Sequence, residues 1–204
     1  MLPCVSKPSH PQLARYLARL PQGLDSYPQC TVRAATMIAA LDLLDLEGTR
    51  GLPEPVRALV EAPPHRSRHI PEAHNLAFFS WLRDERFEGE EGYLTFTDAV
   101  FHRFYAMPLY RVAFMMGRPD QVASASSRIW SWVRHGTRLE VTARGAQHVW
   151  LRVTTPPHLF DALHARVLCR GLAVAYRLTH GQQHLAVSSH EQTSTELRMK
   201  VTWD

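Results

Sequence analysis

The hydrophobic pattern of this chain changes its period near residue 136, and this change limits the folds it can adopt. Before that point apolar residues recur every three or four positions, the spacing of an amphipathic helix. After it, four stretches alternate apolar and polar residues, as half-buried strands do. The pattern predicts a helical part, residues 21–136, followed by a ββαββ part, residues 137–204. The alternating stretches are residues 137–144, 147–155, 183–190 and 195–203.

One long helix is predicted between the two strand pairs, roughly over residues 157–179, with Thr155 as its cap. Its middle, residues 167–176, is apolar on nearly every face, which predicts burial between the sheet and the other helices. Gly171 costs this helix on the order of 1 kcal/mol, so we expect close backbone packing there. The fold class predicted is α+β: a layer of about six short helices, then a four-stranded antiparallel sheet with one long buried helix.

The first twenty residues are predicted to be an arm, and residues 21–204 a single domain. Residues 9–20 have the spacing of a short amphipathic helix, and prolines precede it. Residues 31–46 also follow the helical period, with Thr31 as the expected cap.

Composition excludes several classes of protein. With 204 residues, 45% of them apolar and 21% charged, the chain is large enough for a core of its own. The net charge is +4, but the arginines are scattered, so we expect no nucleic-acid partner. Three cysteines without paired spacing predict free thiols. The sequence has no signal pattern and no run of about 20 apolar residues, which predicts a cytoplasmic protein without a membrane partner.

The segment PPHRSRHIPEAH, residues 63–74, carries three histidines and is the strongest candidate in the sequence for a metal or catalytic site. His65 and His69 have the spacing of a helical metal-binding pair, but Pro71 disfavours a helix there, so we predict no metal site. The sequence contains no GxSxG, GxxxxGK or GxGxxG motif, and we predict no catalytic residue. A Ser–His triad assembled by the fold stays open as an alternative.

Aromatic and methionine side chains gather between Tyr105 and Trp132, typical either of a core or of an apolar ligand pocket. The predicted ligand-binding residues are His74, Tyr110, Arg111 and Trp130, with the arginine and histidine as polar contacts.

Several segments resemble a myxobacterial paralogous family of roughly two-hundred-residue proteins without an assigned function. They include LPQGLDSYPQCTVRAA (20–35), MPLYRVAFMMGRPDQV (107–122) and TTPPHLFDALHARVL (154–168). The order of helices followed by ββαββ is also similar to haem-dependent nitric-oxide sensor domains, a likeness of fold only. Those domains carry a Tyr-x-Ser-x-Arg signature on the haem propionates. Its nearest counterpart here, SASSR (124–128), lacks the tyrosine, so we expect no cofactor and no haem.

Together these features favour a non-enzymatic cytoplasmic module that binds a small apolar molecule, a partner protein, or both. One alternative is a pure interaction or scaffold protein, including a homodimer, which predicts an exposed apolar patch of several hundred Å². A second alternative is an enzyme with a histidine-based acid/base or metal site, which predicts a second histidine or a carboxylate beside His74. The binding module predicts a cavity of roughly 300 Å³ or more.

Overall fold

The computed structural model describes residues 9–46, 48–107, 119–178 and 185–203. In this part of the chain six α-helices precede the larger sheet, and a seventh lies between its strand pairs. The helices are α1 (Pro11–Arg19), α2 (Ala35–Leu41), α3 (Glu54–Glu61), α4 (Glu72–Arg86), α5 (Glu90–Tyr105), α7 (Pro119–Val133) and α8 (Ala162–Arg177), with a 3₁₀ turn η1 (Gly23–Asp25) after α1.

The larger sheet has four antiparallel strands in the order β4-β5-β7-β6, and this confirms the predicted α+β class. Its buried face consists of facing pairs such as Leu151 with Met199 and Val153 with Leu197, while intervening positions are more exposed. This is the alternation of a sheet with one face on the core. The strands are β4 (Arg138–Gly145), β5 (His148–Thr154), β6 (Leu185–Gln192) and β7 (Glu196–Trp203).

A second, three-stranded sheet joins distant segments and was not predicted. Strand β1 (Thr31–Arg33) pairs with β2 (His69–Pro71) and with β3 (Arg134–His135), both antiparallel. The predicted helix over residues 31–46 is therefore wrong at its start, because α2 begins only at Ala35. Strand pairing on both edges of β1 outweighs the helical preference that the local spacing of apolar residues indicates.

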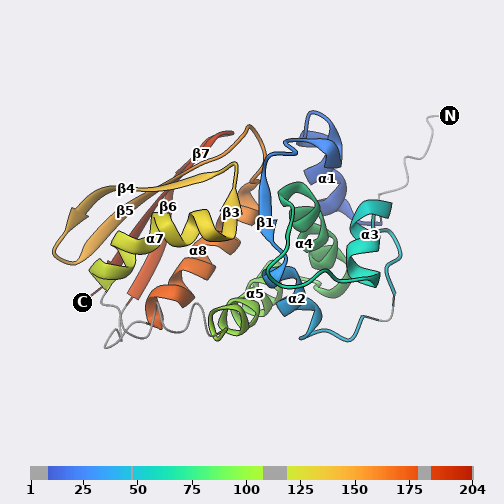
Figure 1. Cartoon of the computed structure of the whole chain (residues 1–204), viewed down its shortest axis with the longest axis horizontal. Helices are drawn as coiled ribbons and strands as arrows, with labels where there is room; N and C mark the ends of the chain where they lie inside the picture. Colours follow the sequence, from blue (N-terminus) through green and yellow to red (C-terminus); the bar gives the residue numbers. More distant parts are fainter. Residues whose placement is uncertain (1–8, 47, 108–118, 179–184, 204) are drawn as a thin grey trace.

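Figure 1 shows how these elements are arranged. The larger sheet, α7 and α8 form one side of the molecule, α1 to α5 form the other, and β1 and β3 lie between them. Helix α8 contacts both α5 and β6, and α7 contacts β4. The predicted position of the long helix, between the sheet and the helical layer, is confirmed.

Helix α8 begins later than the pattern predicts. Its cap is Asp161, whose side chain accepts a hydrogen bond from the backbone nitrogen of His164, in place of Thr155. A carboxylate at this position also interacts favourably with the positive end of the helix.

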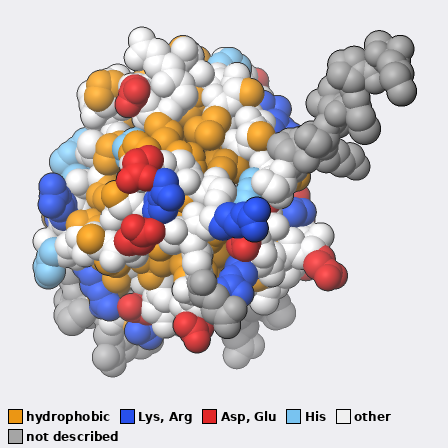
Figure 2. All heavy atoms as spheres, turned by 90° about the vertical axis from the view of Figure 1, so that its right-hand side faces the viewer, with side chains coloured by type: hydrophobic (Ala, Val, Ile, Leu, Met, Phe, Trp, Pro, Cys, Tyr) orange, Lys and Arg blue, Asp and Glu red, His pale blue; other side chains and the backbone are white. Residues whose placement is uncertain are grey.

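Helix α1 lies within the predicted arm and packs on α4 with Leu13 and Tyr16 buried. Asp84 on α4 accepts hydrogen bonds from the backbone nitrogens of Gln12 and Leu13, at 2.7 and 3.1 Å, which satisfies two free donors at the start of α1. Figure 2 shows this helical end, where charged side chains of both signs lie among hydrophobic ones. No helix among the described residues is long and apolar enough to cross a bilayer.

Gly171 allows Phe101 of α5 to lie directly against the α8 backbone. A Cβ atom at this position would lie 2.6 Å from Cζ of Phe101, well inside van der Waals contact. We predict that Gly171→Ala lowers the free energy of unfolding by about 1–3 kcal/mol, because the ring must move in a packed interface. Urea denaturation measures this loss.

Gly48→Ala is the matched control, since a Cβ at Gly48 meets nothing within 4 Å, and we expect a change within about 0.5 kcal/mol. Adding Phe101→Leu should recover part of the loss in the Gly171 variant. Equal stability of the two alanine variants would contradict the close packing.

Candidate functional site

The more apolar of two internal cavities lies between α5, α7, α8 and β4. Its volume is about 70 Å³. Trp130 forms part of its wall and is 8% exposed, and its indole nitrogen donates to Thr137 Oγ1 at 3.1 Å, which fixes the ring. We call this space the apolar cavity; its remaining walls include Phe101, Phe104, Val122, Ile129, Val133, Leu139, Leu168, Leu172, Ala175 and Tyr176.

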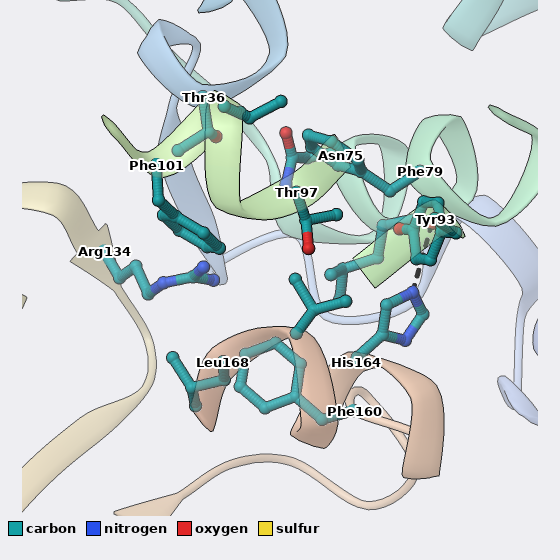
Figure 3. A pocket seen from close by; sticks show the side chains of 13 residues that line it. Thr36, Asn75, Phe79, Tyr93, Thr97, Phe101, Arg134, Phe160, His164 and Leu168 are labelled. Carbon is teal, nitrogen blue, oxygen red and sulfur yellow. Dashed lines mark hydrogen bonds between the residues drawn. The ribbon is translucent and has the colours of Figure 1, made fainter. Parts of the chain in front are cut away.

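A second cavity, of about 40 Å³, lies between α2, α4, α5 and α8. Figure 3 shows its lining, with Asn75 and Thr97 above, Phe160 and Leu168 below, and Arg134 reaching in from one side. We call this space the polar cavity. It shares four lining residues with the apolar cavity, and the two therefore meet at one wall: Thr36, Phe101, Arg134 and Leu168.

Arg134 is the charged residue at that shared wall. Its guanidinium pairs with Glu72 at the start of α4, whose side chain has no exposed surface. The same group lies 5.0 Å from the ring centre of Trp130 and 5.4 Å from that of Phe160. The ion pair and the two aromatic faces hold the arginine in place and compensate for its burial.

Apart from His164, whose Nδ1 lies 3.0 Å from Asp161, three side chains of the polar cavity carry a buried polar atom without a hydrogen-bond partner among the described residues. They are the Thr36 hydroxyl, the Asn75 side-chain oxygen and the Tyr93 hydroxyl. Burial raises the pKa of Tyr93 above its ordinary value, so the phenol stays protonated and can both donate and accept. Buried polar groups in folded proteins are nearly always hydrogen-bonded, so three such atoms around one space indicate a site for water or for the polar groups of a ligand.

A Ser–His–Asp contact does occur, beside the polar cavity. Ser80 Oγ lies 3.2 Å from His164 Nε2, and His164 Nδ1 lies 3.0 Å from Asp161. Ser80, however, is fully buried in the middle of α4 and lines neither cavity, so a substrate carbonyl has no path to its oxygen. The histidine ring also contacts the Leu76 carbonyl at 3.3 Å. The contacts therefore support a structural network.

Asp161 stabilises this network as a carboxylate. Burial opposes its ionisation, but the adjacent His164 and two backbone N–H groups hold the pKa of Asp161 well below its usual range. Tyr16 lies edge-on to the His164 ring with centroids 4.9 Å apart, which fixes the ring from a third side.

The structure separates the predicted site residues. Trp130 lines the apolar cavity. His74 lines neither cavity, because it lies on the face of α4 toward η1, where Leu24 and Asp25 influence its ring. No histidine or carboxylate among the described residues hydrogen-bonds to it. Tyr110 and Arg111 lie outside the described residues.

The histidine-rich segment is spread over the surface rather than gathered. His65 hydrogen-bonds to Ser67 at 2.8 Å, and His69 stacks on His135 with ring centres 4.2 Å apart. Among the described residues no group of three or more histidine, cysteine, aspartate or glutamate side chains is placed to hold a metal ion.

Sequence reasoning missed the residues around the polar cavity. Glu72, which begins α4, is the partner of Arg134. Asn75 was the one available signal, because an amide between buried apolar positions of α4 needs a partner.

No family model and no curated protein sequence matches this chain. Three solved structures share its fold at low sequence identity. A protein studied for haem redox potential changed by porphyrin distortion is 10% identical, with 83% of this chain and 99% of that chain covered and a TM-score of 0.52. A structure reported for the mechanism of H-NOX activation is 8% identical, with 83% of this chain and 93% of that chain covered and a TM-score of 0.54. A doubly substituted H-NOX domain is 10% identical, with 84% of this chain and 94% of that chain covered and a TM-score of 0.54.

The fold is that of H-NOX domains, and the predicted likeness to haem-dependent sensor domains is confirmed at the level of fold. The likeness overturns the prediction that the chain has no cofactor, since one of these structures is described as a haem protein. The missing tyrosine of one motif was too narrow a basis for that prediction. The likeness to the myxobacterial family stays a prediction.

Both cavities are far smaller than the roughly 300–1,000 Å³ of pockets for larger ligands. Among the described residues, His164 is the histidine that lines one of these cavities, the polar cavity. Both of its ring nitrogens face protein groups. In the part of the chain that the structure describes, the side chains therefore do not fit a haem, and no step below depends on one.

We predict that Arg134→Met lowers the free energy of unfolding by about 3–5 kcal/mol, because it leaves the Glu72 carboxylate buried without its partner. Chemical denaturation measures the loss. The double variant Glu72→Leu with Arg134→Met should recover most of it. As a control, removing the exposed ion pair of Arg57 and Glu54 should change stability by about 0.5 kcal/mol or less. Similar losses in both pairs would refute this role for Arg134.

His74 should make stability fall as the pH falls. Burial lowers its pKa in the folded protein, against the opposing influence of Asp25 and the Leu24 backbone. The unfolded chain therefore takes up a proton near pH 6.5 while the folded protein does not, and stability declines from about pH 7 toward the lower folded pKa. We predict that His74→Gln reduces this slope in melting temperatures measured from pH 7.5 to 5. An unchanged slope would show that His74 does not contribute.

Proposed function

We propose that this protein is a cytoplasmic sensor module that binds a small, largely apolar molecule in the apolar cavity and signals through a partner protein, without catalysing a reaction. The observation that carries the proposal is the apolar cavity between α5, α7, α8 and β4, bordered by Trp130. Its volume of about 70 Å³ is well below the roughly 300 Å³ that we expected for a binding module. The fold shared with H-NOX domains supports a sensory role.

The size and lining of the cavity define the ligand class. A space of about 70 Å³ with mainly hydrocarbon walls stays dry and favours apolar guests, whereas a much larger pocket is needed for drug-sized ligands. The ligand therefore has only a few non-hydrogen atoms, or it enlarges the space by moving a wall.

The placement of α7 supports signalling. This helix supplies five described residues to the cavity wall and runs directly into β3, which pairs with β1 of the helical part. A ligand that shifts α7 would therefore act on the contact between the two sides of the molecule.

A pure interaction protein is the second candidate function. Trp132, next to the small sheet, is 44% exposed, and Leu43 is 41% exposed. Large aromatic residues at a surface are common anchors of protein interfaces. A homodimer that buries Trp132 would leave the cavity without a role.

We predict that small apolar guests bind and stabilise the protein. Xenon NMR and thermal unfolding with benzene measure the effect, and a ligand at about ten times its Kd raises the free energy of unfolding by about 1.4 kcal/mol. Ala175→Leu, which fills the cavity, should abolish binding, and Leu139→Ala, which enlarges it, should strengthen binding.

Two results would overturn the proposal. One is the absence of binding to both the wild type and the Leu139→Ala variant, which retains the space even if the filled variant is unstable. The other is stoichiometric uptake of added hemin with a Soret band, which would replace the small apolar ligand by a haem.

A further inference from the structure

The polar cavity has features that the proposed function does not use. Its three unpartnered atoms come from three different helices: Thr36 from α2, Asn75 from α4 and Tyr93 from α5. All three residues are at least nine-tenths buried, with exposures of 7%, 2% and 0%. Leaving a polar atom unpaired in such a place costs about 1–3 kcal/mol, so three of them are not explained by packing alone.

The cavity has room for a small polar group. A volume of about 40 Å³ accommodates roughly three water-sized groups. Phe101, Arg134 and Leu168 line both this space and the apolar cavity, so one molecule reaches both spaces when these side chains move apart. Figure 3 shows Arg134 pointing into the space from the side of β3, with Phe101 above it and Leu168 below.

The available atoms determine the chemistry of that group. The Asn75 oxygen only accepts hydrogen bonds, whereas the hydroxyls of Thr36 and Tyr93 donate and accept. A ligand hydroxyl can donate to the amide oxygen and accept from a protein hydroxyl at the same time. A carbonyl group cannot donate to Asn75, and a hydrocarbon satisfies none of the three atoms.

The charge of the wall favours a neutral ligand. Glu72 already neutralises Arg134, and its second carboxylate oxygen has no hydrogen-bond partner among the described residues. An anion near this wall would meet a buried carboxylate, and a cation would meet a buried guanidinium. Neither charge is favoured in a space without a free counter-ion.

We infer that the ligand is a neutral alcohol or phenol, with its hydroxyl in the polar cavity and its hydrocarbon part in the apolar cavity. This inference rests on the proposed function, since it names the chemical class of molecule that the same site takes. Thr36, Asn75 and Tyr93 bind the hydroxyl, and Phe101 and Leu168, which line both spaces, move apart to admit the ligand.

The test compares two probes of similar shape, benzene and phenol, by calorimetric titration of the full chain. Transfer from water favours benzene, so tighter binding of phenol reports hydrogen bonds in the site. We expect phenol to bind at least tenfold more tightly than benzene to the wild type. In Asn75→Leu and Tyr93→Phe this ratio should fall to about one or below.

Tyr16→Phe is the matched control, because the Tyr16 hydroxyl is also buried without a partner among the described residues but lines neither cavity. This variant should keep the wild-type ratio. Melting temperatures provide a second readout: Asn75→Leu and Tyr93→Phe should be as stable as the wild type or more so, because each removes an unpaired polar atom.

The outcomes separate the two proposals. Benzene binding as tight as phenol binding, or a ratio unchanged in both cavity variants, would overturn the hydroxyl inference and leave the apolar sensor standing. A loss of the ratio in Tyr16→Phe as well would also overturn it. Failure of both probes to bind to the wild type and to Leu139→Ala would overturn the proposed function itself.

Discussion

The buried ion pair between Arg134 and Glu72 joins the two sides of this molecule. Arg134 belongs to β3, directly before the larger sheet, and Glu72 begins α4 in the helical part. Two opposite charges inside a protein are tolerated only when they meet with good geometry, so this contact restricts how α4 and β3 can be placed. Both cavities have Arg134 at their common wall, and their shapes therefore depend on the same contact.

The site is therefore best described as two adjoining spaces of different character. One is lined by hydrocarbon and the indole of Trp130, and the other by an amide and two hydroxyls without partners among the described residues. The Ser80–His164–Asp161 contacts, which resemble a catalytic arrangement in distance, stabilise the wall next to the second space. Burial of the serine, rather than the hydrogen-bond distances, decides between a structural and a catalytic role.

The ββαββ part was predictable because its signals are local. Alternation over seven or eight residues defines each strand, and the apolar run around Gly171 defines a helix buried on most faces. Strand β1 was not predictable in the same way, since its pairing partners lie far along the chain and local residues favour a helix. The ion pair joins residues 62 positions apart, and no spacing in the sequence indicates it. Trp130 lies at a cavity wall because large aromatic residues on a buried helix usually face the interior.

The three-stranded sheet also has a consequence for how the chain acquires its structure. Thr31 in β1 lies opposite His135 in β3, a separation of 104 residues, so the middle strand keeps one open edge until most of the polypeptide has been synthesised. Closing such a long loop is entropically costly and slow compared with forming helices. A fragment that ends before β3 thus cannot complete this sheet, although all three of its strands precede the change of hydrophobic period near residue 136.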